Sequence, residues 1–179
     1  MQYIKHYNSP LGDLLMAADE QGLTGLWLEG QRTPAQEQEA AKRDTVSDCP
    51  ALIKTAEWLD IYFKGRDPGF LPPIHMEGTA FRKEVWEILL EIPYGETTTY
   101  GRIAEQIAAK RGMARMSAQA VGGAVGSNPI SIIVPCHRVV GTNGSLTGYA
   151  GGIDKKIRLL ELEGVDMSKF FVPKKGTAL

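Results

Sequence analysis

One cysteine stands in a sequence setting that could support nucleophilic chemistry. Cys136 follows an apolar run and a proline, and His137 and Arg138 come directly after it. Polar residues that emerge from a buried run can favour the thiolate, which is the reactive form of cysteine. The glycine-rich stretch 141–152 comes next and would let a ligand approach closely. The pattern indicates an activated thiol, although a free cysteine is more often a small buried apolar residue.

The residues beside this cysteine also have structural interpretations. His137 could be a base for the thiol or a histidine with its hydrogen bonds satisfied in the core. For Arg138 we favour a structural ion pair. The other cysteine, Cys49, has no comparable neighbours, and we expect it to be inert.

Composition places the chain among ordinary globular proteins. It has 179 residues, 43% of them hydrophobic, which suits one domain or two small ones. The N-terminal 20 residues alternate polar and apolar types without the apolar block of a signal peptide. With 2 cysteines and 3 histidines, a disulfide scaffold or a structural zinc site is improbable. We therefore expect a protein of the reducing cytoplasm with free thiols and no metal.

Charge is unevenly distributed along the chain. Residues 101–158 carry 8 Lys and Arg against 2 Asp and Glu, although the whole chain has a net charge of −1. This window is either a solvated basic face or the footprint of a polyanion such as DNA.

The hydrophobic pattern predicts an α+β protein with two domains. Residues 1–75 should form an N-terminal α/β support domain with a small antiparallel sheet of strands 2–7, 13–18 and 23–28. We expect an irregular connection over 31–48 and a helix over 50–63. Three prolines and three glycines in 65–78 indicate a linker.

The second domain, residues 76–179, is expected to be mostly helical. Its predicted elements are helices 80–90, 100–109, 117–126 and 153–163, a buried strand 130–134, an active-site turn 134–140 and an irregular tail 165–179. Two short helices inside the basic window suggest a helix-turn-helix over about 97–127. Helix 117–126 is rich in Gly and Ala, so either a neighbouring helix or a nucleic-acid strand could approach it closely.

Several sequence blocks resemble one protein family. They are IVPCHRVV at 133–140, AVGGA at 120–124, Asn128-Pro129, GYAGG at 148–152 and LLELEG at 159–164. At this spacing they are similar to the signature of the O6-alkylguanine-DNA alkyltransferases, which are methylated-DNA–protein-cysteine methyltransferases. The similarity is dense from about residue 79 to 164, roughly half of the chain. Residues 1–75 match the family only in layout, which is ribonuclease-H-like.

The resemblance implies direct-reversal DNA repair without a cofactor. The substrate would be O6-alkylguanine in double-stranded DNA, with O4-alkylthymine a further possibility, and the base would be flipped out through the minor groove. Cys136 would take the alkyl group irreversibly, so each chain would act once. A monomer is expected, with no membrane partner.

The resemblance also assigns roles to individual residues. His137 would act as base through a water, Glu163 would orient His137, and Tyr100 would donate a proton and contact a phosphate. Asn128 would support the active-site turn. Substrate binding is assigned to Val139, Tyr149 and Ala150, and DNA binding to Arg115, Gln119, Ala120, Gly122 and Gly123.

The sequence departs from the family pattern at the residue that fills the gap left by the flipped base. The family commonly has arginine where this chain has Gln119. Glutamine keeps hydrogen-bonding capacity but lacks the charge and the planar stacking of arginine, so we expect weaker base flipping or weaker DNA affinity. Alternative functions are a non-catalytic sensor of alkylated DNA, a DNA-binding regulator and a Cys-His hydrolase.

Overall fold

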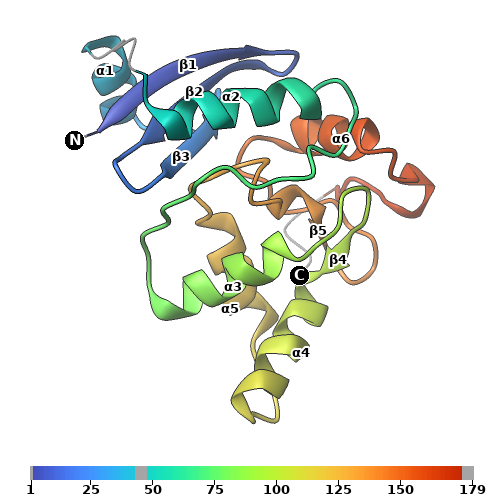
Figure 1. Ribbon diagram of the computed structural model, residues 1–179. Coiled ribbons are helices and arrows are strands. Elements are labelled where there is room, and N and C mark those ends of the chain that lie inside the picture. The colour runs from blue at the N-terminus through green and yellow to red at the C-terminus, as the bar shows by residue number, and fades with distance from the viewer. Residues whose placement is uncertain (1, 43–47, 175–179) are drawn as a thin grey trace. The chain divides into compact units, whose positions relative to one another are not determined.

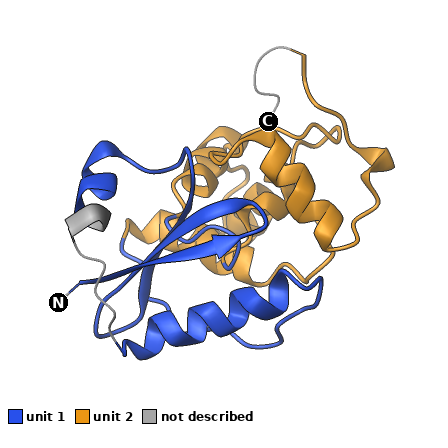
Figure 2. Cartoon of the chain, turned by 90° about the horizontal axis from the view of Figure 1, so that it is seen from above, with its two compact units in different colours: residues 1–77, 129–133 blue, residues 78–128, 134–179 orange. Residues whose placement is uncertain are grey.

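The computed structural model describes residues 2–42 and 48–174. The chain divides into two compact units (Figure 2). The first runs to residue 77 and includes 129–133, and the second consists of 78–128 and the chain from 134 onward. Segment 129–133 therefore belongs to the first unit, although it lies within the expected second domain.

The first unit is built on a three-stranded antiparallel sheet in the order β1-β2-β3 (Figure 1). Strands β1 (Tyr3–Ser9), β2 (Gly12–Ala18) and β3 (Leu23–Leu28) confirm the three predicted strands to within two residues. Helix α2 (Pro50–Tyr62) packs against β2 and β3, as its apolar spacing predicts.

The prediction of an irregular connection over 31–48 is wrong for its first part. Helix α1 occupies Pro34–Lys42, while residues 43–47 lie outside the described part of the chain. Thr33 and Gln36 exchange hydrogen bonds between side chain and backbone N–H, which is the reciprocal cap of a helix start. Good helix formers and a cap suffice here, so the helix forms without the apolar stripe that the sequence analysis sought.

The predicted strand over 130–134 is also wrong. Ile130 makes a single parallel bridge to Leu26, and turns follow. Ile132 has φ 70° and the Ile133 N–H donates to the Ser131 carbonyl at 2.8 Å, which closes a tight three-residue turn. The segment is apolar because all of its residues are buried, and a short buried run does not by itself distinguish a strand from other structures.

The second unit is mostly helical (Figure 1). Its helices are α3 (Ala80–Leu90), α4 (Tyr100–Arg111), α5 (Ala118–Gly126) and α6 (Ile153–Leu162). Helices α3, α4 and α5 pack against one another, and α4 and α5 form the predicted helix-turn-helix pair. Thr79, Thr99 and Ser117 cap the starts of α3, α4 and α5 with their hydroxyl oxygens.

Short elements connect these helices around the cysteine. The 3-10 turn η1 (Cys136–Arg138) leads into strand β5 (Val139–Val140), which pairs in parallel with β4 (Thr98–Thr99) just before α4. The tail contains the 3-10 turn η2 (Met167–Lys169), and residues 175–179 are outside the described part. The pairing of β4 and β5 places the start of α4 beside the cysteine turn.

Candidate active site

The cysteine sits in a turn that the backbone closes tightly. The Cys136 N–H donates to the Val134 carbonyl at 2.8 Å, and Pro135 at the centre of this turn has φ −83° and ψ 65°. Only 8% of Cys136 is exposed. Burial raises the pKa of its thiol, while hydrogen bonding from Asn128 and the positive charge of Lys156 oppose that rise.

Asn128 links the end of α5 to this turn. Its side-chain amide donates to the Val134 carbonyl at 2.8 Å. A hydrogen bond between this side chain and Cys136 acts to lower the pKa of the thiol. Asn128 therefore contacts the cysteine turn, and its role as a support of that turn stays a prediction.

His137, Arg138 and Glu163 form a buried network behind the cysteine. His137 Nε2 donates to Glu163 Oε2, and Arg138 Nε donates to Glu163 Oε1 at 2.7 Å. Arg138 also donates to the Ile92 carbonyl at 2.7 Å, and the Gly95 N–H donates to Glu163 at 3.1 Å. The ion pair favoured for Arg138 is present, and its partner is the glutamate expected to orient His137.

This network sets the protonation of the histidine. Burial lowers the pKa of His137, although hydrogen bonding and charge attraction from Glu163 oppose that effect. The imidazole is therefore neutral at pH 7. Because Nε2 carries the proton that Glu163 accepts, Nδ1 holds the lone pair that a base needs.

Tyr100 contacts the loop that follows β5. The Tyr100 hydroxyl donates to the Thr147 carbonyl at 3.2 Å. Burial raises the Tyr100 pKa to about 12, so the hydroxyl keeps its proton at neutral pH. Tyr149 is buried in the same loop and Ala150 is exposed. With Tyr100 only 1% exposed, its phosphate contact stays a prediction.

One residue near the cysteine was missed by the sequence analysis. Lys156, on α6, is fully buried and was counted there only as part of the basic window. Its ammonium donates to the Val139 carbonyl at 2.6 Å and to the Thr147 carbonyl at 2.9 Å. The available signal was its spacing, because Lys156 lies three and four residues before the apolar Leu159 and Leu160 and shares their buried side of the helix.

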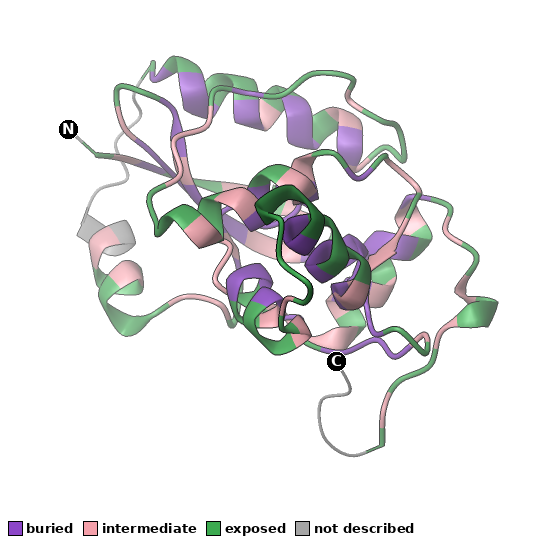
Figure 3. Ribbon diagram, turned by 90° about the horizontal axis from the view of Figure 1, so that it is seen from below, coloured by how far each residue is buried: buried purple, intermediate pink, exposed green. Residues whose placement is uncertain are grey.

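The small-residue helix α5 presents an open face. Gln119, Ala120 and Gly123 are exposed, while Gly122 is half-buried. A Cβ at Gly123 or at Gly126 would meet nothing within 4 Å. Tight helix packing therefore does not explain why these two positions are glycine. The opposite face of α5 is buried, and Figure 3 shows such burial by colour.

Family models match both parts of the chain. The DNA-binding domain of 6-O-methylguanine DNA methyltransferases matches residues 80–165, and their ribonuclease-like domain matches residues 2–74. The chain belongs to this family. The methylated-DNA–protein-cysteine methyltransferase of Mycobacterium tuberculosis is 44% identical over 91% of this chain and 93% of that protein. The one from Haemophilus influenzae is 40% identical over 91% and 87%.

Solved structures agree with this family assignment. The O6-methylguanine methyltransferase of M. tuberculosis has a TM-score of 0.76 at 40% identity, covering 98% of this chain and 97% of that one. The M. tuberculosis protein in complex with DNA has a TM-score of 0.75 at 41% identity, covering 94% of both. These relationships confirm the predicted fold class and support DNA repair by alkyl transfer.

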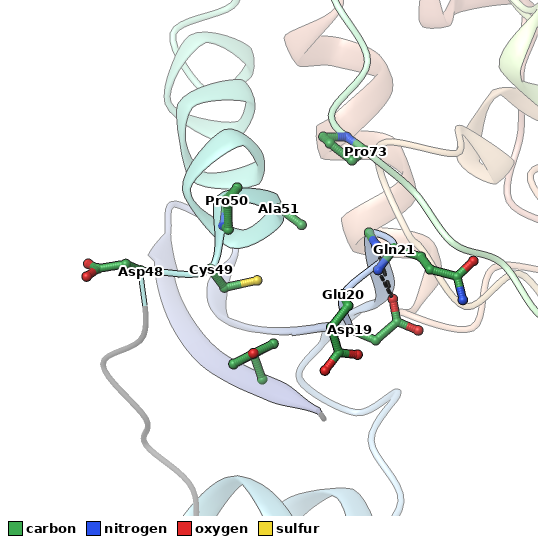
Figure 4. Close-up of a pocket in the computed structure, with 10 residues that line it drawn as sticks. Asp19, Glu20, Gln21, Asp48, Cys49, Pro50, Ala51 and Pro73 are labelled. Atoms are coloured by element: carbon green, nitrogen blue, oxygen red, sulfur yellow. Dashed lines mark hydrogen bonds between the residues drawn. The ribbon is translucent and has the colours of Figure 1, made fainter.

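The second cysteine, Cys49, has a different setting from Cys136. Cys49 precedes α2 and lines a pocket of about 520 Å³ within the first unit (Figure 4). None of the residues assigned to the active site lines this pocket. Its Asp19 accepts hydrogen bonds from the Gln21 and Gly22 N–H groups and from His75, so this carboxylate stabilises a turn.

The described residues show neither a metal-binding cluster nor a membrane-spanning helix. Within residues 2–42 and 48–174, no group of three or more His, Cys, Asp or Glu side chains could hold a metal ion. No helix in that part of the chain is long and apolar enough to cross a membrane.

Proposed function

We propose that this protein repairs O6-alkylguanine in double-stranded DNA by moving the alkyl group to its own Cys136. The sulfur attacks the alkyl carbon, an S–C bond forms and the C–O6 bond breaks. A thioether is stable under mild conditions, so each chain reacts once. The observation that carries the proposal is the cysteine turn backed by a neutral His137 and the buried Glu163 carboxylate.

The proton balance follows from the tautomer of His137. The thiol proton passes through a water to Nδ1, while Nε2–H remains bound to Glu163. The departing guanine would be an anion unless it gains a proton, and the protonated Tyr100 hydroxyl serves as its donor. The imidazolium then returns the proton to the tyrosinate through solvent.

Base recognition is assigned to the backbone around the turn and to the following loop. The Cys136 and Val139 carbonyls accept from the exocyclic amine of guanine, which adenine lacks at that position. Tyr149 donates to O6, and Ala150 lies beside the alkyl group. The Val139 N–H donates to the Cys136 carbonyl, which holds the two carbonyls at a set spacing.

DNA binding is assigned to the exposed face of α5. A helix face made of Ala120, Gly122 and Gly123 suits the narrow minor groove, and the exposed Arg115 beside it suits a phosphate. Gln119 would occupy the space left by the flipped base. Binding should depend little on sequence, because phosphates and base extrusion provide most of its energy.

The test is intact-mass spectrometry after mixing the protein with a duplex that contains O6-methylguanine. We expect the mass of one added methyl group per chain, located on the Cys136 peptide and absent in Cys136→Ser. Cys49→Ser is the matched control and should accept the methyl group normally. An unmethylated protein that binds the lesion tightly would instead indicate a damage sensor.

Three smaller expectations accompany this proposal. A parallel duplex with O4-methylthymine shows whether that base is also a substrate. A monomer is expected, which light scattering would test. We place the protein in the cytoplasm, where both free thiols would stay reduced; fractionation of expressing cells would check this.

A further inference from the structure

Lys156 is a buried charge that takes no part in the proton and alkyl transfers of the proposed function. Its side chain is fully buried, and a lysine is seldom buried unless its ammonium is bound. Its ammonium donates to two backbone carbonyls, those of Val139 and Thr147, rather than to a carboxylate. A hydrogen bond to a carbonyl does not neutralise the ammonium charge. An ion pair therefore does not explain why this lysine is buried.

The two carbonyls belong to the two segments that surround the flipped base in the proposed function. Val139 follows the cysteine turn, and Thr147 precedes Tyr149 in the substrate loop. The Thr147 carbonyl also accepts from the Tyr100 hydroxyl. One ammonium on α6 therefore ties together the cysteine turn, the substrate loop and the residue expected to protonate guanine.

We propose that Lys156 is a positioning residue for base recognition, which fixes the Val139 carbonyl so that it faces the exocyclic amine of the alkylated guanine. A carbonyl oxygen has two lone pairs, so the bond to Lys156 leaves one for the base. Preorganised acceptors improve discrimination because no rearrangement is needed when the base arrives. This inference rests on the proposed function.

The electrostatics of the site agree with this role. Burial lowers the pKa of Lys156 to about 8, which still leaves the ammonium mostly charged at neutral pH. Its charge favours the Cys136 thiolate. Loss of Lys156 should therefore slow transfer in general and, in addition, weaken the preference for a base that carries the amine.

The experiment compares two duplex substrates, O6-methylguanine and O6-methylhypoxanthine, which lacks the exocyclic amine. Single-turnover methylation of Cys136 is measured for the wild type, Lys156→Met and the control Lys155→Met. Met is similar in length to Lys but has no donors, and Lys155 precedes Lys156 on the same helix. Thermal unfolding verifies that each variant is folded.

For the wild type and Lys155→Met, we expect methylation by the guanine substrate to be about tenfold faster than by the hypoxanthine substrate. This ratio is what one hydrogen bond to a buried acceptor contributes. In Lys156→Met this ratio should fall to about twofold or less. An unchanged ratio, with both substrates slowed equally, would overturn the inference and indicate a structural role only. A wild type that transfers methyl from both substrates without preference would also overturn it.

Two further outcomes are distinguishable. If Lys156→Met does not fold, Lys156→Leu replaces it, since the leucine side chain is also uncharged and has no N–H donor. A reduced ratio in that variant supports the inference, and an unchanged ratio overturns it. If Cys136 of the wild type is methylated by neither substrate, the proposed function fails, and the inference fails with it.

Discussion

Replacing Glu163 by glutamine tests the buried network behind the cysteine. Glu163 accepts from His137, from Arg138 and from the Gly95 N–H, and its side chain is fully buried. Glutamine has nearly the same shape, but only its oxygen can accept. At least one of the three donors then loses its partner, and the buried Arg138 charge is no longer balanced.

The expected loss of stability can be estimated from this arrangement. Breaking a buried ion pair by removing one partner costs about 3–5 kcal/mol, and an isosteric change belongs near the lower end. At about 2–4 °C per kcal/mol for a chain of this size, the melting temperature of Glu163→Gln should fall by about 6–12 °C.

The effect on chemistry follows from the histidine tautomer. The amide of glutamine can donate to Nε2 of His137, which would move the imidazole proton to Nδ1 and remove the base. We expect methyl transfer to slow by about 10²- to 10⁴-fold, the usual contribution of a general base. The rate is measured by rapid quench with the O6-methylguanine duplex, under conditions in which every variant is folded.

Glu161→Gln is the control for this experiment. It makes the same change of charge on α6 at an exposed position, so its stability should stay within about 0.5 kcal/mol of the wild type. If Glu163→Gln matched this control in both stability and transfer rate, the network would not hold His137 as described, and the reasoning would be refuted.

Three other predictions concern the substrate loop, DNA binding and the buried lysine. Gly148→Ala should slow methyl transfer more than Gly112→Ala in the same rapid-quench assay. Both glycines have positive φ, but only at Gly148 would a Cβ meet the Tyr100 hydroxyl, at 2.9 Å. In a fluorescence anisotropy titration, Gln119→Arg should bind duplex DNA more tightly than Gln38→Arg. Both changes add an exposed positive charge, but only residue 119 lies on α5, the helix to which DNA binding is assigned. From pH 8 to 10.5 the stability of the wild type should rise relative to Lys156→Met, by up to roughly 3 kcal/mol in denaturant titrations, because the unfolded state retains the lysine proton that the folded state has lost.

The elements that the sequence predicted correctly are those with a repeating pattern. Period-two alternation located the three strands, and apolar spacing located α2 to within one residue of its end. Helix α1 lacks such a pattern because its sequence contains no large apolar residue, and its cap was the only indication. Residues 130–134 are all buried, and their mostly apolar sequence reflects that burial. It does not distinguish a strand from a turn, so only the structure shows the backbone conformation.

The candidate site shows the same division. Cys136 was found from its neighbours, and the roles of His137 and Glu163 came from the family resemblance. Their hydrogen bond joins residues 26 apart in sequence and depends on where α6 packs. Lys156 was missed because an isolated lysine reads as a surface residue unless its place on the helix is examined together with the buried residues around it.

One side of α6 explains why these buried charges occur together. Lys156 and Glu163 are seven residues apart, about two helical turns, so they lie on the same side of that helix axis. Glu163 binds the first part of the cysteine turn through His137 and Arg138, and Lys156 binds its end through Val139. A purely apolar contact could hold the turn at lower cost in desolvation. Charged groups instead fix the direction of an imidazole proton and of a carbonyl lone pair, which packing alone does not specify.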